Sequence, residues 1–427
     1  MSSAPEPTWF GQPRGLTVLF LTNMWEQFSY YGMRALLVYY MTKQLLFSQE
    51  HSSFVYGAYT ACAYFTPIVG GVVADRLLGK RRAVVIGASV MAAGHFMMAF
   101  EPLFYVALLT IALGNGLFLP SLPSQINDLY APGDPRRGWA YNVYYVGVNI
   151  GGFLAPLICG TLGEFYGWHY GFGAAGVGMF AGLLIYLKGQ KYLPPEPPRT
   201  VDRDASPLRW ADHKRTFLVL VAIALSVTVF RGAYEQVGNT VALWADTGVD
   251  RSAGGFVIPM TWFQSLNPLM VMLMTPPLLA WWQRRAAAGK DSSPARRMAL
   301  GATIVAGAYL LLALVEWAGG GGRADWLWFV AFFAIFTLGE LFVLPTGLGL
   351  FARLAPPRLG ATTVAAWYLA IFTGSLSAGL VGMLWSRTAH APYFALLAVI
   401  ALVAAGLLRM LDRQVRIIDP TWISESH

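Results

Sequence analysis

The chain consists of long apolar stretches separated by short breaks that are charged or rich in glycine and proline. A helix rises about 1.5 Å per residue, so about 20 apolar residues cross the hydrocarbon layer of a bilayer. The stretches reach this length and lack the alternation of a strand, and lipid accepts only helices or closed barrels. We therefore predict twelve membrane-spanning helices, at residues 16–44, 53–77, 82–101, 103–130, 138–163, 168–189, 215–244, 253–282, 297–317, 325–353, 359–386 and 390–412.

The composition supports a membrane protein, because 56% of the residues are hydrophobic and 12% are charged. A soluble globular chain carries about twice that share of charge. One long polar, proline-rich segment separates six predicted helices from the other six. We expect an all-α membrane protein with an N-terminal six-helix bundle at 1–192, a cytoplasmic linker at 193–214 and a C-terminal six-helix bundle at 215–427.

The lysines and arginines are distributed unequally between the two sides of the predicted bilayer. The side opposite the termini has only Lys43, Arg251, Arg323 and Arg387. Because cytoplasmic loops carry an excess of cations, we expect both termini in the cytoplasm and the protein in the plasma (inner) membrane. This bias and anionic lipid explain the net charge of +8, so we expect no nucleic-acid partner. Residues 1–15 are polar and do not resemble a signal peptide.

Five acidic or arginine side chains lie well inside the predicted spans: Glu26, Arg34, Arg231, Glu235 and Glu340. Charges in the bilayer are costly and usually mark substrate or proton sites. Arg231 and Glu235 lie four residues apart and can neutralise each other within one helix. Glu26 and Arg34 are about 12 Å apart along their helix, so their partners must come from other helices.

The polar residues of the first predicted helix share one face. Spacings of three and four residues place them on a single stripe. Such a stripe must line a water-filled cavity or meet partners on other helices, because it cannot face lipid. The stripe contains Asn23, Glu26, Gln27, Tyr30, Tyr31 and Arg34.

For several other polar residues in the spans, the position along the helix favours a structural role. Glu316 lies near the outer end of its helix, and His95 lies among methionine and phenylalanine residues. Cys62 and Cys159 both fall within predicted spans, so we expect core residues rather than a disulfide or a zinc site. The spans lack a His-, Asp- or Cys-rich cluster, so we predict no enzyme, metal site or cofactor.

Short motifs in both halves carry a family pattern. A glycine-rich segment followed by an Asp-Arg pair and a basic run, at residues 70–82, is similar to the general facilitator motif. In it, Asp75, Arg76 and Arg81 could latch the cytoplasmic side in one conformer. The remaining motifs resemble the proton-dependent oligopeptide transporter (POT) family over essentially residues 12–385. They lie at 25–34, 141–153, 168–172, 235–236, 264–268 and 339–341.

The resemblance implies a major facilitator fold that imports di- and tripeptides by proton symport through alternating access. The expected partners are small peptides, protons and the lipid bilayer, and the protein is expected to work as a monomer. Carried over residue by residue, the resemblance implies that the peptide contacts Tyr30, Tyr31, Arg34, Tyr64, Asn149, Asn267, Glu340 and Trp367.

The resemblance also suggests which part of the peptide each of these residues contacts. Glu340 would face the peptide amine, Asn149 and Asn267 its backbone, and Trp367 would shape a side-chain pocket. Proton coupling and gating would involve Glu26, Arg34, Arg231 and Glu235. Within this set, Arg34 would pair with Glu235 when the outer side closes.

The sequence departs from the family pattern in the first and fourth helices. The family motif Glu-x-x-Glu-Arg is replaced by Asn23, Glu26 and Gln27, and Leu119 occupies the position of a family lysine. Burial of an isolated carboxyl favours its neutral form, which would let Glu26 carry a proton. Glu235 is the other candidate for the proton site. A facilitator for another small amphiphile, or a peptide carrier with altered or absent proton coupling, remains the alternative.

Overall fold

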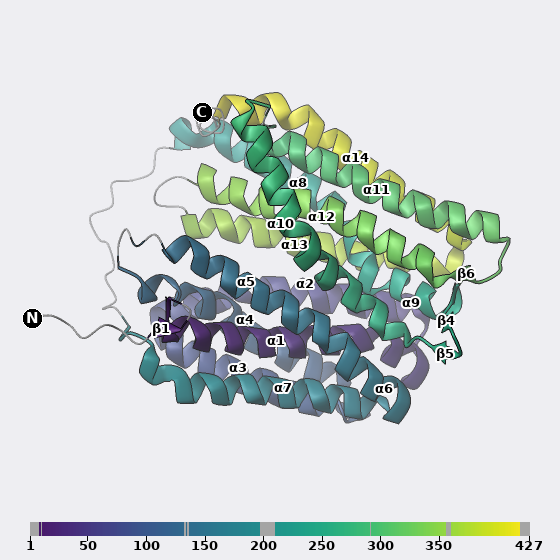
Figure 1. Ribbon diagram of the computed structural model, residues 1–427, viewed down its shortest axis with the longest axis horizontal. Coiled ribbons are helices and arrows are strands. Elements are labelled where there is room, and N and C mark those ends of the chain that lie inside the picture. The colour runs from purple at the N-terminus through teal and green to yellow at the C-terminus, as the bar shows by residue number, and fades with distance from the viewer. Residues whose placement is uncertain are drawn as a thin grey trace, which may run out of the picture. The chain divides into compact units, whose positions relative to one another are not determined.

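The structure is a computed structural model that describes residues 8–9, 11–131, 134, 136–196, 210–290, 292–355 and 360–418. The chain forms two compact units (Figure 1). Unit 1 contains Met1–Leu46 and Cys62–Thr200, and unit 2 contains Phe47–Ala61 and Val201–His427. The predicted linker falls mostly on residues 197–209, outside the described residues, so the predicted domain boundaries stay a prediction.

Unit 1 consists of long helices and one short strand pair. The helices are α1 (Arg14–Tyr39), α2 (Gln49–Val73), α3 (Lys80–Met97), α4 (Phe104–Ser124), α5 (Arg136–Ala155), α6 (Thr161–Tyr166) and α7 (Trp168–Gly189). The first part of α2 belongs to unit 2. Strands β1 (Thr8–Trp9) and β2 (Gln12–Pro13) pair antiparallel before α1.

Helix α1 is central to unit 1, where it packs against α5 and α7. Small residues permit this close approach. A side chain at Gly151 of α5 would collide with the Met24 carbonyl, and one at Gly182 of α7 would press on Trp25. Gly32 of α1 in turn faces the Cys159 side chain. The glycines therefore position the polar stripe of α1 within the unit.

Unit 2 also consists of helices and short strand pairs. Its helices are α8 (Trp210–Tyr234), α9 (Thr240–Thr247), α10 (Leu266–Ala287), α11 (Pro294–Gly319), α12 (Trp326–Leu354), α13 (Gly360–Gly382) and α14 (His390–Ile418). Strands β3 (Val249–Asp250) and β6 (Ala324–Asp325) pair in parallel, and β4 (Ser252–Ala253) and β5 (Phe256–Val257) form a hairpin.

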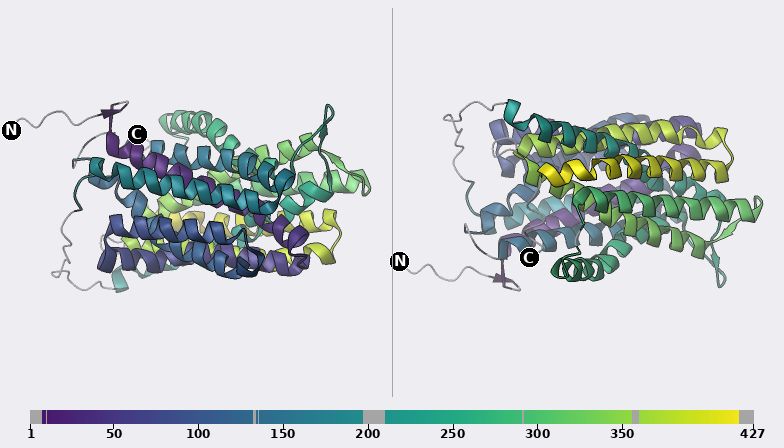
Figure 2. Two further views of the ribbon diagram at one scale, coloured as in Figure 1. Left: turned by 90° about the horizontal axis from the view of Figure 1, so that it is seen from below. Right: turned by 90° about the horizontal axis from the view of Figure 1, so that it is seen from above.

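Within unit 2, α11 and α14 run side by side, and α11 also packs against α12 (Figure 1). Gly301 and Gly339 meet there, since a side chain at either would lie 2.5–2.6 Å from the carbonyl of the other. This contact fixes the segment of α12 that carries Glu340. Helix α10 contacts α12, and its C-terminal end stands apart from the other helices of the unit in Figure 2.

Helices occupy all the predicted stretches, but some boundaries differ. Residues 253–265 do not form the predicted start of a long helix; they hold the β4–β5 hairpin and a short 3₁₀ helix, Met260–Ser265. Gly254 and Gly255 have positive φ angles of 57° and 88°, which glycine adopts readily and a helix cannot use. The amphipathic end of α14 also extends beyond the predicted limit at 412.

Nine helical segments among the described residues are long and apolar enough to cross a membrane. Helices α1, α3 and α10 are not among them. The reason is composition: α1 carries the polar stripe, α3 begins with Lys80, Arg81 and Arg82, and α10 contains Asn267, Gln283 and three prolines. The total of twelve spans therefore stays a prediction.

Candidate functional site

Unit 1 contains a small cavity of about 80 Å³ beside the polar stripe of α1. Residues of α1, α2 and α4 form its walls. Six of the residues singled out from the sequence meet here. The lining comprises Glu26, Gln27, Tyr30, Tyr31, Ala63, Tyr64, Asn115 and Leu119.

Glu26 is the acidic group of this cavity, and 1% of its surface is exposed. Its Oε2 accepts a hydrogen bond of 2.7 Å from Nε2 of Gln27. Within the described residues this is the one hydrogen bond of the carboxyl group. A neutral amide solvates a charge without cancelling it, so Glu26 can change its protonation state without breaking an ion pair.

Asn115 completes the cavity and was not identified from the sequence. Its Nδ2 donates to the Ala63 carbonyl over 2.8 Å, and the residue is 5% exposed. Gly116, its neighbour in α4, permits a close approach to Thr66 of α2. The sequence did contain a signal for Asn115, namely a polar amide between two glycines of an apolar helix. Such an amide needs a hydrogen-bond partner within the protein, because lipid offers none.

Other predicted polar residues of unit 1 lie outside the cavity lining. Asn23 Nδ2 donates to the Tyr144 carbonyl over 3.4 Å and so connects α1 to α5. Asn149 Nδ2 donates to Tyr145 in its own helix over 3.0 Å. Arg34 is partly buried farther along α1. The predicted contacts of Asn149 and Arg34 with a peptide stay predictions.

In unit 2, Arg231 and Glu235 of the α8 region form an ion pair, with 3% and 1% of their side chains exposed. Arg231 also donates to Ser375 Oγ over 3.3 Å. Its guanidinium carbon lies 4.7 Å from the centroid of the Tyr234 ring. The structure thus contains the i,i+4 pair that the sequence offered as one alternative. The predicted pairing of Glu235 with Arg34 stays a prediction.

Glu340 is held from two other helices of unit 2. The Tyr234 hydroxyl of α8 donates to its Oε1 over 2.7 Å, and Asn267 Nδ2 of α10 donates to its Oε2 over 2.5 Å. The same Asn267 nitrogen lies 3.0 Å from Thr337 Oγ1. Each oxygen therefore accepts a hydrogen bond from a neutral donor on another helix, which fixes the position of the carboxylate.

The structure adds contacts for Asn267 and brings in Tyr234. Asn267 donates to Glu340, and its predicted contact with a peptide backbone stays a prediction. Tyr234 was not singled out, although it directly precedes Glu235. Trp367 is 3% exposed and packs against Phe351, with ring centroids 5.3 Å apart.

Comparisons with known proteins assign the family. The POT family model matches residues 81–202 and 201–397. The di-/tripeptide transporter of Lactococcus lactis subsp. cremoris is 30% identical, covering 96% of this chain and 97% of the relative. The chain belongs to the POT family. An uncharacterized transporter of Bacillus subtilis, YclF, is also 30% identical, covering 96% of both chains.

Solved POT structures share the fold. A crystal structure of a POT peptide transporter in complex with sulfate has a TM-score of 0.89 at 28% identity, covering 98% of each chain. A POT family transporter in complex with 5-aminolevulinic acid has a TM-score of 0.88 at 23% identity. These POT proteins are transporters rather than enzymes. With its apolar helices, this POT chain is a multi-pass membrane protein.

The facilitator motif of this POT chain does not form an Asp75–Arg81 pair. Asp75 is exposed, and its side chain makes no hydrogen bond or ion pair within the described residues. The Arg81 guanidinium donates to the carbonyls of Leu193 and Pro194, over 2.7 and 2.5 Å. Lys80 pairs with Asp128 over 2.8 Å. The latch of Asp75, Arg76 and Arg81 stays a prediction for another conformer.

The remaining polar residues can now be placed. Cys159 is buried as expected, whereas the expectation of a core residue was wrong for Cys62, which lies on an exposed face of α2. A helix in lipid can present a cysteine outward because its side chain is nearly apolar. Glu316 accepts a hydrogen bond of 2.8 Å from Trp244 Nε1, and His95 is fully buried.

Proposed function

We propose that this POT protein imports di- and tripeptides across the plasma (inner) membrane by proton symport through alternating access. In this proposal it has twelve membrane-spanning helices in two six-helix bundles, 1–192 and 215–427, joined by a cytoplasmic linker. Both termini are cytoplasmic, and the protein works as a monomer. The named peptide transporters among its relatives support the substrate class.

The observation that carries the proposal is the arrangement around Glu340. A carboxylate in a mostly apolar helix is costly unless it is hydrogen-bonded or serves a ligand. Tyr234 and Asn267 hold its two oxygens in place with hydrogen bonds from two other helices. A peptide ammonium group can form short, charge-assisted hydrogen bonds with a carboxylate that is oriented in this way. Glu340 is therefore our candidate for the amine-binding residue.

The other peptide groups require different chemistry. The carboxylate needs a cation, and the proposal assigns it to Arg34 or Arg231, because Gln27 and Leu119 replace the family cations. Asn149 and Asn267 are assigned to the peptide backbone. The aromatic residues Tyr30, Tyr31, Tyr64 and Trp367 provide apolar surfaces that accept varied peptide side chains.

Proton coupling is assigned to Glu26 or Glu235. Glu26 meets only a neutral donor among the described residues, so gaining a proton breaks no ion pair. Glu235 is paired with Arg231, so its protonation would release a buried arginine. That arginine, or Arg34, would then be able to take another anion as the gate changes state.

A second candidate rests on the neutral neighbour of Glu26. If Gln27 removes the charge network on which coupling depends, the protein is a facilitator or a peptide carrier with altered or absent proton coupling. Its substrate could then be another small amphiphile. This candidate differs from the first in energetics and substrate, but not in fold.

Uptake of a labelled dipeptide into proteoliposomes tests both candidates. We expect accumulation above the outside concentration under an inward proton gradient, and none after a protonophore is added. Counterflow at equal pH without gradient-driven accumulation would favour the facilitator. The absence of both, in protein that is correctly folded by size-exclusion chromatography, would reject a peptide substrate.

A further inference from the structure

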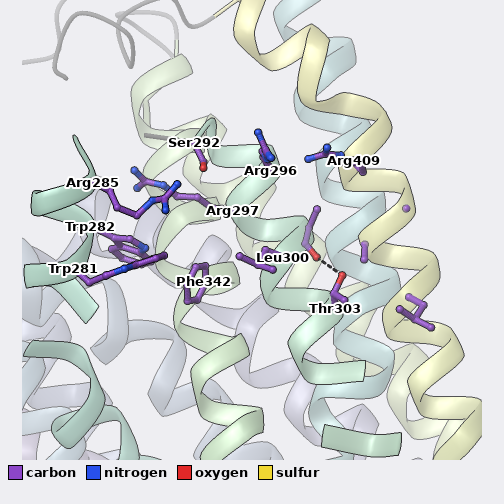
Figure 3. Close-up of a pocket in the computed structure, with 14 residues that line it drawn as sticks. Trp281, Trp282, Arg285, Ser292, Arg296, Arg297, Leu300, Thr303, Phe342 and Arg409 are labelled. Carbon is purple, nitrogen blue, oxygen red and sulfur yellow. Dashed lines mark hydrogen bonds between the residues drawn. The ribbon is translucent and has the colours of Figure 1, made fainter. Parts of the chain in front are cut away.

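A cavity of about 600 Å³ lies in unit 2 and shares no residue with the candidate site described above. Helices α10, α11, α12 and α14 form its walls (Figure 3). Four arginines line it, and its lining contains no acidic residue among the residues that the structure describes. The arginines are Arg285, Arg296, Arg297 and Arg409.

Two of the four arginines, Arg285 and Arg297, each lie over the ring of a tryptophan. The Arg285 guanidinium lies 5.1 Å from the Trp281 ring centroid and donates to the Lys290 carbonyl over 3.0 Å. The Arg297 guanidinium lies 5.2 Å from the Trp282 ring centroid. Stacking on a ring orients an arginine and leaves hydrogen-bond donors at its edge, where a phosphate can accept them.

The position of Arg296 and Arg297 also favours an anion. Both lie in the first turn of α11, which begins at Pro294 and is capped by Ser293. The N-terminus of a helix is its positive end, so cations there are repelled unless an anion compensates them. The nearby Asp412 carboxylate already accepts from Ser293 and pairs with Arg416 over 2.8 Å.

The rest of the cavity is apolar and open to the surroundings. Leu300 of α11 and Leu402 of α14 are 48% and 44% exposed. Beside them, a side chain added at Gly406 would meet nothing within 4 Å. Figure 3 shows the arginines together at one end of the cavity, with Leu300 and Thr303 farther along the helices. The cavity therefore has a cationic end that continues into an apolar groove.

We propose that this cavity binds an anionic glycerophospholipid, with its phosphate among the arginines and an acyl chain along the groove between α11 and α14. Free phosphate would make no use of the groove, and a zwitterionic lipid would bring a cationic group to an end of the cavity that four arginines line. Basic pockets between membrane helices suit lipid headgroups of this kind. The proposal does not depend on which solute the protein transports.

Native mass spectrometry of the full-length protein, titrated with phosphatidylglycerol in detergent, tests the proposal. The variant Arg285→Gln/Arg409→Gln removes two cavity charges, and Arg284→Gln/Arg413→Gln removes two charges from the same helices outside the lining. We expect affinity to fall about tenfold or more in the first variant and less than about threefold in the second. Equal losses would overturn the proposal, because the attraction would then be diffuse.

A second variant separates a lipid from a free anion. Gly406→Phe fills the groove and keeps the charge of all four arginines, and the open space at Gly406 can accommodate the larger side chain. We expect weaker phosphatidylglycerol binding, unchanged phosphatidylcholine binding, and no competition by soluble glycerol 3-phosphate. Unchanged lipid affinity in Gly406→Phe, or full competition by glycerol 3-phosphate, would show an anion site without lipid recognition.

Discussion

Glu26 of unit 1 and Glu340 of unit 2 are both carboxyl groups within membrane helices, but their surroundings differ. Glu26 accepts from the adjacent residue of its own helix, Gln27. Glu340 accepts from Tyr234 on α8 and Asn267 on α10. A group held by two other helices has a fixed position, which suits ligand binding. A group held only by its neighbour can change its charge without separating helices, which suits proton transfer.

Glu340→Gln should give the largest effect if this comparison is correct. It removes the negative charge but keeps a side chain of similar shape. A hydrogen bond to a charged group is worth about 1.5–3 kcal/mol, so we expect peptide affinity to fall about tenfold to hundredfold. The measurement is competition binding of a dipeptide with a free amino terminus.

Glu316→Gln is the matched control, because Glu316 is also a partly buried glutamate of unit 2 but accepts from Trp244. Its affinity should remain within about twofold of the original protein. An N-acetylated dipeptide should bind equally weakly to the original protein and to Glu340→Gln. Unchanged affinity of the free dipeptide in Glu340→Gln would remove the amine assignment.

Glu26→Gln should reduce proton-driven accumulation of the peptide rather than peptide affinity. The amide cannot take up or release a proton, so we expect gradient-driven accumulation to fall at least about tenfold. Counterflow at equal pH should be nearly retained, because Glu26 is not assigned to the peptide. Accumulation that survives in Glu26→Gln and disappears in Glu235→Gln would transfer the proton site to the Arg231–Glu235 pair.

The sequence predicted the helices well because lipid imposes both their length and their composition. It failed at residues 253–265, where apolar residues form a hairpin and a 3₁₀ helix. The high hydropathy of these residues favoured a helix in the prediction. Gly254 and Gly255 adopt positive φ angles, which an α-helix does not contain, and they form a turn instead. A short segment that connects two helices can also be apolar, because it packs against them. Hydropathy alone therefore cannot distinguish such a segment from a membrane span.

The candidate site was only partly predictable. Glu26 and Glu340 stood out because buried charges are rare in lipid, and the spacing of Arg231 and Glu235 offered their pair directly. Tyr234 and Asn115 did not stand out, because tyrosine and asparagine also occur at helix ends and interfaces. Their roles depend on contacts with Glu340 and Ala63, which lie far away in sequence.

Tyr234→Phe should sharpen the comparison with a smaller effect. It removes one neutral donor to Glu340 and preserves the ring near Arg231. The expected loss is about 1 kcal/mol, or about fivefold in peptide affinity. Tyr309→Phe is the control, since Tyr309 donates to the Ala233 carbonyl instead. Equal losses in both variants would indicate general damage to unit 2 rather than a role for Tyr234 at Glu340.

Gln27→Leu should give the smallest effect, because it removes a neutral hydrogen bond from Glu26 without changing any charge. If Glu26 works as a proton carrier that is only weakly held, we expect gradient-driven accumulation to change by about threefold or less. Peptide affinity and thermal stability in detergent should remain close to those of the original protein. A loss as large as that of Glu26→Gln would mean that the Gln27 amide fixes Glu26 as firmly as Tyr234 and Asn267 fix Glu340. The contrast between the two carboxyl groups would then fail, and Gln27 would be an essential part of the coupling site.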